Sequence, residues 1–203
     1  MATKAKQGKR PSKESPDATE LLVLELQEIH NAESQLTRVG PRLSKSIDSE
    51  KLIQMMDERL EEGERIIKDI EGVFEEMEES PGRKKNVAAE GLINDAREHV
   101  QEIESGPSLD AVLIGAIQKT EHYCIAAWGT AKALGAAVGQ KTVVRAMDRA
   151  LKVGGEFDKR LTALAENEIT PALLAQGSQN EGEEGGGRQQ RGNGGDGGRR
   201  AST

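Results

Sequence analysis

The sequence predicts an all-α fold, a bundle of four long helices with one short helix inserted between its two hairpins. Apolar residues recur at alternating steps of four and three in four long segments, the spacing of helices that pack against other helices. The 203 residues are 35% apolar and only 2% aromatic, which suits one domain with an aliphatic, alanine-rich core. No segment carries the alternating pattern of a strand.

The first helix is expected over residues 17–46, with a kink or a short break at Pro41. Asp48 and Ser49 have the side chains of a helix cap, and they precede a second helix that should stop at Ser80. These two helices are predicted to form the first hairpin.

A third, shorter helix is expected over residues 86–104, before the Ser-Gly-Pro sequence that follows it. The fourth helix should cover residues 108–138. After a turn at Gly139, the fifth should cover residues 141–166. The third helix is therefore the one inserted between the two hairpins.

The two ends of the chain differ in composition from the bundle, which is expected over residues 17–168. Residues 169–203 form a glycine-rich tail that we expect to be flexible. Residues 1–16 have nothing to bury, so we expect a disordered arm. This arm is basic, through Lys4, Lys6, Lys9, Arg10 and Lys13.

Composition also limits the compartment in which the protein is expected. The only cysteine, Cys124, cannot form an intramolecular disulfide, which fits a reducing environment. No secretory signal is visible, and no segment approaches the ~20 apolar residues that span a bilayer. We therefore expect a cytoplasmic protein that does not interact with membranes.

A carboxylate interrupts the apolar seam of the first helix. Burying an isolated carboxylate is costly, so an acid at such a position has to be paired, protonated or bound to a cation. Other helices should therefore contribute partners. The seam consists of Leu22, Leu26, Ile29, Glu33, Leu36, Gly40 and Leu43.

Three further glutamates are candidates for the same layer of the bundle. Glu62 and Glu33 lie at similar distances from the turn between their helices, about 20 Å at ~1.5 Å per residue. Glu121 interrupts the seam of the fourth helix, and Glu90 lies on the apolar side of the third. Glutamates from successive helices can hold two cations, such as iron or manganese, in a bundle core. The alternative is that Glu62 and Glu90 face solvent.

Five short motifs resemble a known family, the YciF and YciE-like bacterial stress proteins of the ferritin-like superfamily. The resemblance covers about residues 18–167. The motifs are Asn31–Thr37, Leu60–Glu62, Ala89–Ile93, Gln118–Tyr123 and Leu161–Ala165. The resemblance implies a ferritin-like bundle, a di-metal site lined by glutamates, a homodimer and a role in the response to stress.

The chain departs from the family pattern at positions where relatives carry likely metal ligands. Arg59 replaces a histidine, Cys124 replaces a second glutamate, and Lys152, Val153 and Gly154 replace a run of glutamates. Arg59 can point inward and act as an internal counter-ion for the carboxylates, or point outward and pair with surface acids. A metal site in this chain would therefore be a degenerate one.

Three other residues are possible accessories of this site. His30 lies one helical turn before Glu33 and can replace the lost imidazole, or it can be an ordinary solvent-facing histidine. His122 points away from Glu121 and is expected to make a hydrogen bond to a ligand of the site or between helices. Cys124 can be a thiolate ligand or a small buried apolar residue.

Three hypotheses follow, and none of them predicts catalysis. The first is a stress protein with a degenerate iron or manganese site at Glu33, Glu62, Glu90 and Glu121. The second is a metal-free helical interaction or structural protein in which Arg59 replaces the cation and exposed faces form a dimer. The third is nucleic-acid binding through the basic arm, which would weaken steeply with salt.

Overall fold

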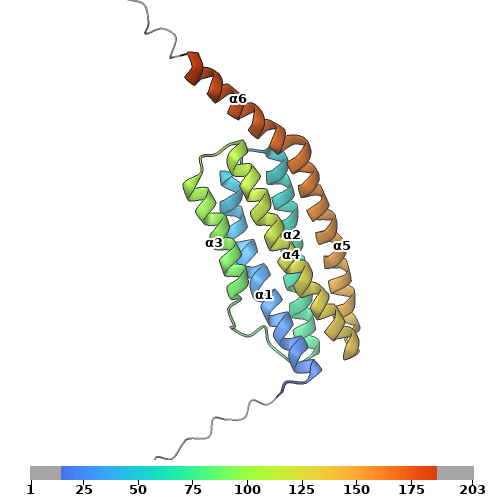
Figure 1. The fold of residues 1–203 in the computed structure, drawn as a ribbon. Helices are drawn as coiled ribbons and strands as arrows, with labels where there is room; N and C mark the ends of the chain where they lie inside the picture. Colours follow the sequence, from blue (N-terminus) through green and yellow to red (C-terminus); the bar gives the residue numbers. More distant parts are fainter. Residues whose placement is uncertain (1–14, 187–203) are drawn as a thin grey trace, which may run out of the picture.

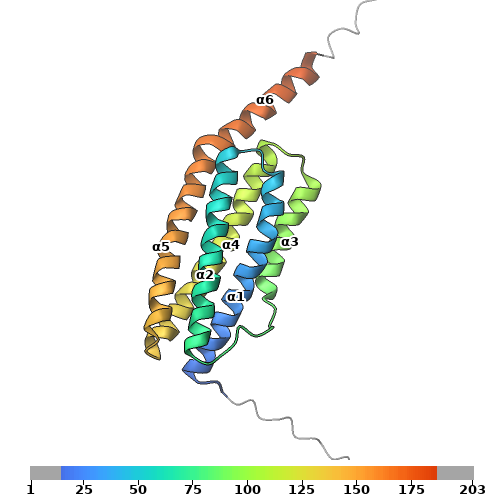
Figure 2. The same ribbon diagram turned by 180° about the vertical axis from the view of Figure 1, so that it is seen from behind.

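The computed structural model describes residues 15–186, in which five helices pack into one bundle (Figures 1 and 2). This range contains no strand, and the predicted all-α fold with a short third helix is confirmed. None of its helices has both the length and the apolar character needed to cross a membrane. The bundle helices are α1 (Ala18–Leu43), α2 (Glu50–Glu76), α3 (Val87–Glu102), α4 (Pro107–Ala137) and α5 (Lys141–Leu164).

The four long helices form the bundle, and α3 lies on its outside. Helix α1 packs against α2 and α4, and α5 packs against the same two helices. Helix α3 contacts α1 and α4, so it covers part of the groove between them (Figure 1). Glutamates on α1, α2 and α4 can therefore meet in the interior only if they lie at the same level along the bundle.

Side-chain caps fix the starts of α1 and α2. Asp17 accepts the backbone N–H of Glu20 at 2.9 Å, and the Glu20 carboxylate accepts the backbone N–H of Asp17 at 2.9 Å. Ser49 caps α2. The buried carboxylate of Asp110 on α4 accepts the backbone N–H groups of Asp48 and Ser49 at 3.0 and 2.8 Å. This contact fixes the α1–α2 turn against the start of α4.

Asn86 fixes the start of α3 against α1. Its backbone N–H donates to Asn31 Oδ1 at 2.8 Å, and its side chain donates to the backbone oxygen of Glu28 at 3.0 Å. Gln35 donates back to the backbone oxygen of Asn86 at 3.0 Å. Because Asn31 and Gln35 belong to the first family motif, part of that motif serves to position α3.

Helix α1 continues through Pro41 without the break that the sequence suggests. It ends at Leu43 and tightens into a 3₁₀ turn, η1 (Ser44–Ser46). Pro41 is exposed, so its ring lies on the solvent side of the helix. The end of this segment at Ser46 agrees with the prediction.

The C-terminal part differs from the flexible tail expected from residue 169. Helix α5 continues through a π-helical segment, η2 (Ala165–Ile169), into α6 (Thr170–Gly186), which projects beyond the bundle (Figure 1). The backbone N–H of Thr170 donates to the oxygen of Ala165, five residues back. The wider turn lets the helix continue into Pro171, which has no N–H to donate. Residues 187–203 lie outside the described range.

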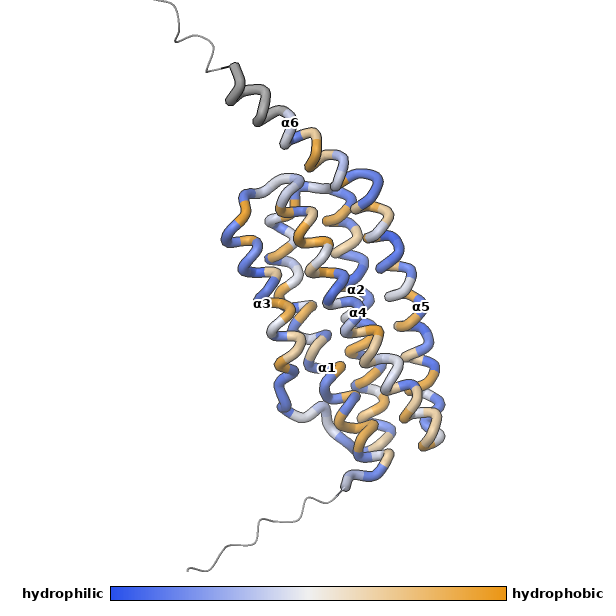
Figure 3. Tube along the Cα trace, in the orientation of Figure 1, coloured by the Kyte–Doolittle hydropathy of each residue, from blue (hydrophilic) through white to orange (hydrophobic). Residues whose placement is uncertain are grey.

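The core consists of two hydrophobic clusters at opposite halves of the bundle. One contains Leu22 and Leu26 of α1 and Trp128 of α4, and the other contains Leu52 of α2 and Leu161 of α5. Figure 3 shows hydrophobic and hydrophilic residues alternating along each bundle helix, as expected for helices with one buried side. Between the clusters lie interior positions that carry no large apolar side chain, among them Glu33, Arg59, Glu121 and Gly154.

Candidate functional site

Three charged side chains from three helices meet between the two hydrophobic clusters. Glu33 of α1 is 0% exposed, Arg59 of α2 is 8% exposed and Glu121 of α4 is 1% exposed. The interruptions of the apolar seams at Glu33 and Glu121 therefore do mark buried acids. We refer to Glu33, Arg59 and Glu121 as the ion triad.

Arg59 points inward and bonds to both carboxylates of the ion triad. Its Nη1 and Nη2 donate to Glu33 Oε2 and Oε1 at 3.1 and 3.0 Å. Its Nε donates to Glu121 Oε2 at 2.5 Å. The planar guanidinium thus holds one carboxylate by two parallel bonds and the other by a third. Of the two orientations left open by the sequence, the inward one is observed.

The guanidinium stays charged in this interior. Burial disfavours its charged form, but the attraction of Glu33 and Glu121 outweighs burial and holds the pKa of Arg59 well above its usual value. A permanently charged group therefore occupies the space between the two acids.

The ion triad holds two acids and one base, so its charges do not cancel if both acids are ionised. Burial raises the pKa of Glu121; Arg59 opposes this increase, while the nearby charges of Glu33 and Asp158 add to it. Glu121 Oε1 is buried and has no hydrogen-bond partner among the described residues. Protonation of Glu121 would remove the excess negative charge.

Cys124 lies next to the ion triad but has the properties of a buried thiol. It is 2% exposed, and burial together with the charge of Glu33 raises the pKa of its thiol well above the usual value. A thiolate ligand at this position is therefore disfavoured. Of the two roles open for Cys124, the small buried apolar residue agrees with this environment.

Two features of the site were not anticipated from the sequence. The centre of the Trp128 ring lies 5.4 Å from the Arg59 guanidinium in a cation–π arrangement. Gly154 of α5 leaves room for both: a Cβ there would lie 2.5 Å from Glu121 Oε1 and 2.6 Å from Trp128 Cζ3. In the sequence, the only signal of this space was that Gly154 interrupts an otherwise apolar helix seam.

Glu62 is buried but belongs to a different group of charges. It is 4% exposed and accepts from Arg65 Nε at 2.8 Å and from Arg149 Nε at 3.5 Å. Arg149 also pairs with Asp69, so this group links α2 to α5. The structure places Glu62 at the level of the ion triad but bonds it to other arginines.

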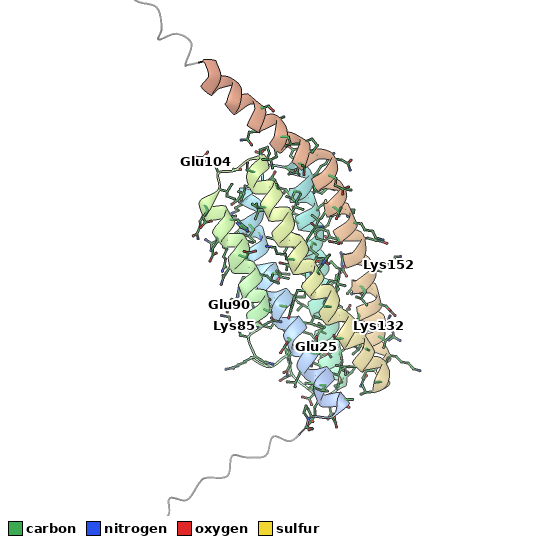
Figure 4. The ribbon with its side chains drawn as sticks, viewed as in Figure 1. Glu25, Lys85, Glu90, Glu104, Lys132 and Lys152 are labelled. Carbon is green, nitrogen blue, oxygen red and sulfur yellow. The ribbon has the colours of Figure 1, made fainter. Side chains whose placement is uncertain are left out.

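Glu90 lies away from the interior. Its side chain is 38% exposed and pairs with Lys85, and both residues lie at the outer edge of α3 in Figure 4. Ala89, Ile93 and Ala96 are the buried residues of α3, so Glu90 is rotated out of its inner face. The four glutamates expected to form one layer are therefore not gathered together.

The two histidines that were candidates for the site lie next to acids outside the ion triad. His30 Nε2 lies 3.1 Å from Glu71 Oε1, and the imidazole ring meets Phe74 edge-on. His122 is 65% exposed, and its Nε2 lies 3.1 Å from Asp158 Oδ1 on α5. The His122 imidazole thus faces an acid of another helix, and its hydrogen bond stays a prediction.

These residues do not fit a di-metal site. In residues 15–186, no three side chains of His, Cys, Asp or Glu are grouped so that they could hold a metal ion. The Arg59 guanidinium already bonds to the carboxylates of Glu33 and Glu121, and its positive charge would repel a metal cation. The arrangement is that of an internal ion pair with an additional acid.

The comparisons with known proteins agree with the fold and with the resemblance seen in the motifs. Residues 17–174 match the sequence model of a family described as a domain of unknown function, DUF892. Protein YciF of Escherichia coli strain K12 is 37% identical over 145 residues, which cover 71% of this chain and 87% of YciF.

Two solved structures are similar to the bundle. The crystal structure of the E. coli stress protein YciF has a TM-score of 0.73 at 34% identity, covering 77% of this chain and 99% of YciF. YcfI, titled a putative structural protein from Rhodopseudomonas palustris, has a TM-score of 0.70 at 29% identity, covering 74% and 96%. The chain therefore belongs to the DUF892 family, the family of the YciF-like proteins.

Proposed function

We propose that this chain is a metal-free structural protein of the stress response, in which Arg59 supplies the internal positive charge that a cation would otherwise provide. The observation that supports the proposal is the set of three hydrogen bonds from Arg59 to Glu33 and Glu121. The similar proteins are described as a stress protein and as a putative structural protein, which supports the same role.

The hydrogen bonds of the ion triad favour neutralisation by Arg59 over metal binding. Both oxygens of Glu33 accept from the guanidinium, and Glu121 has only Oε1 free of a protein partner. A metal would have to take carboxylate oxygens from a base that does not lose its proton in proteins. The ion triad also connects α1, α2 and α4, and a buried charge group of this kind can specify how helices align.

A degenerate iron or manganese site is the competing proposal. The free Oε1 of Glu121 and the excess negative charge of the ion triad favour it. Elemental analysis of protein purified without chelator and without affinity-tag metal separates the two. We expect far less than one iron or manganese per chain. A near-stoichiometric content that is lost in Glu33→Ala would overturn the metal-free proposal.

A variant tests whether the guanidinium itself keeps metal out. Arg59→Ala removes the charge and leaves Glu33 and Glu121 facing the vacated space, so uptake of Mn²⁺ in equilibrium dialysis should exceed that of the wild type. Arg149→Ala is the matched control, because it removes a partly exposed arginine that pairs with Glu62 outside the ion triad. Equal uptake by the two folded variants would show that Arg59 does not exclude cations.

The interaction partners expected from the sequence stay predictions. A homodimer would suit a structural role, and sedimentation equilibrium of the full chain would detect it. The basic arm within residues 1–16 lies almost wholly outside the described residues. Nucleic-acid contact through it predicts a salt-sensitive gel shift that disappears when residues 1–13 are deleted.

A further inference from the structure

A small, partly open cavity lies between the bundle helices next to the ion triad. Its volume is about 60 Å³, and α1, α2, α3 and α4 all contribute to its wall. Arg59 and Glu121 form part of this wall, while most of the remainder consists of the carbon atoms of aliphatic side chains. The cavity thus lies between the charged layer and the second hydrophobic cluster.

The wall offers a water molecule few hydrogen-bond partners. Thr37 and Thr120 line the cavity, but their hydroxyls donate to the backbone oxygens of Glu33 and Ala116, each at 2.9 Å. Arg59 Nε bonds to Glu121 Oε2 at 2.5 Å. The unpartnered Oε1 of Glu121 lies against Gly154 of α5, a helix that does not contribute to the wall. A buried water usually needs two to four polar partners, so water is poorly held in a space of this kind.

The cavity also lies close to the surface. Four aliphatic side chains of its wall, Leu36, Leu60, Leu92 and Ile117, are only half-buried, one from each of the four helices. Rotamer changes of such side chains are fast on the scale of ligand exchange. A small molecule can therefore reach the cavity without unfolding of the bundle.

We propose that this cavity is a binding site for a small, uncharged, apolar molecule. A dry engineered cavity of roughly 150 Å³ binds benzene or xenon, and the smaller space here suits the smaller of these two ligands. A charged ligand is disfavoured, because most of the wall is apolar and the Arg59 guanidinium is already bonded to Glu33 and Glu121.

Xenon is the probe for this proposal. Full-length protein titrated with dissolved xenon should give a saturable ¹²⁹Xe NMR shift, and a crystal pressurised with xenon should show one atom in the cavity. A xenon shift that only grows in proportion to protein concentration and shows no saturation with xenon would overturn the proposal. Ordered water filling the cavity in an unpressurised crystal would overturn it as well.

Two variants that fill the cavity connect the signal to this site. Ala116→Val adds methyl groups to the wall from α4 and should abolish the saturable shift. Ala96→Val does the same from α3 and serves if the first variant fails to fold. Gly115→Ala is the matched control, because its new methyl group would have no atom within 4 Å, and Gly115 does not line the cavity. Unchanged xenon binding in a folded cavity-filling variant would place the site elsewhere and refute the proposal.

Discussion

Arg59 of α2 holds both carboxylate oxygens of Glu33 of α1, with N–O distances of 3.1 and 3.0 Å. Both side chains are at least nine-tenths buried, so solvent hardly screens the pair. Removal of either partner of such a buried pair leaves an uncompensated buried charge, so the fold depends on both side chains. The first prediction follows from this dependence.

Arg59→Ala should lower the free energy of unfolding by about 3–5 kcal/mol, because it leaves buried carboxylates without a counter-ion. Arg149→Ala is the control: Arg149 is 44% exposed, and Glu62 keeps Arg65 as a partner. Arg149→Ala should lower the free energy of unfolding by only about 0–1 kcal/mol, as expected for an exposed ion pair. Urea denaturation at pH 7 measures both. Equal losses in the two variants would contradict the role assigned to Arg59.

Glu121 should make the stability of the protein depend on pH in the direction opposite to that of most acids. Burial raises its pKa in the folded state above the ordinary value of 4.5, so the folded state binds its proton more tightly than the unfolded state. The stability of the wild type relative to Glu121→Gln should therefore be highest below pH 4.5. It should fall as the pH rises through the raised pKa.

Urea midpoints of the two proteins, measured at a series of pH values from 4 to 8, test this prediction. The comparison with Glu121→Gln removes the contribution of other acids, such as Asp95, whose pKa is lowered by its hydrogen bond to Lys119. A difference that is constant with pH, or that favours the wild type at higher pH, would show that Glu121 is not the group responsible.

The sequence predicts the helices and the level of the charged layer, because both depend on spacing along the chain. Glu33 and Glu121 could be assigned to the interior since each interrupts a regular apolar seam. Glu90 could not be placed in the same way. It follows the buried Ala89 by one residue, which rotates it by about 100° round the helix. How α3 turns toward α1 and α4 depends on contacts that no local pattern records.

The partners of Glu62 and the direction of Arg59 depend on tertiary packing. Glu62 lies at the predicted level, but its bond to Arg149 requires the position of α5 relative to α2. Arg59 is long enough to reach solvent or the core, so composition and spacing left both orientations open. The helical continuation through Pro171 was missed because proline usually ends a helix, and a π-helical segment is rare.

Ile169 should anchor this continuation to the bundle. It is 6% exposed and packs in the second hydrophobic cluster, so Ile169→Ala should lower the free energy of unfolding by about 2–5 kcal/mol. Leu174→Ala, five residues later in α6, is the control because Leu174 is 68% exposed. It should change stability by less than about 0.5 kcal/mol. Thermal unfolding of both variants checks the prediction, and similar effects would mean that η2 is not packed as described.

Gly154 and Gly155 are adjacent on α5, and alanine should have opposite effects at the two positions. At Gly154 the new methyl group would lie 2.5 Å from Glu121 Oε1, a carboxylate that Arg59 holds in place. Gly154→Ala should therefore cost about 1–3 kcal/mol in urea denaturation, as overpacking of a core does. At Gly155 the added Cβ would have no atom within 4 Å, so Gly155→Ala should stabilise the helix by up to about 1 kcal/mol. Neutral behaviour of Gly154→Ala would mean that Glu121 can move away from α5, and the ion triad would then be looser than its hydrogen bonds indicate.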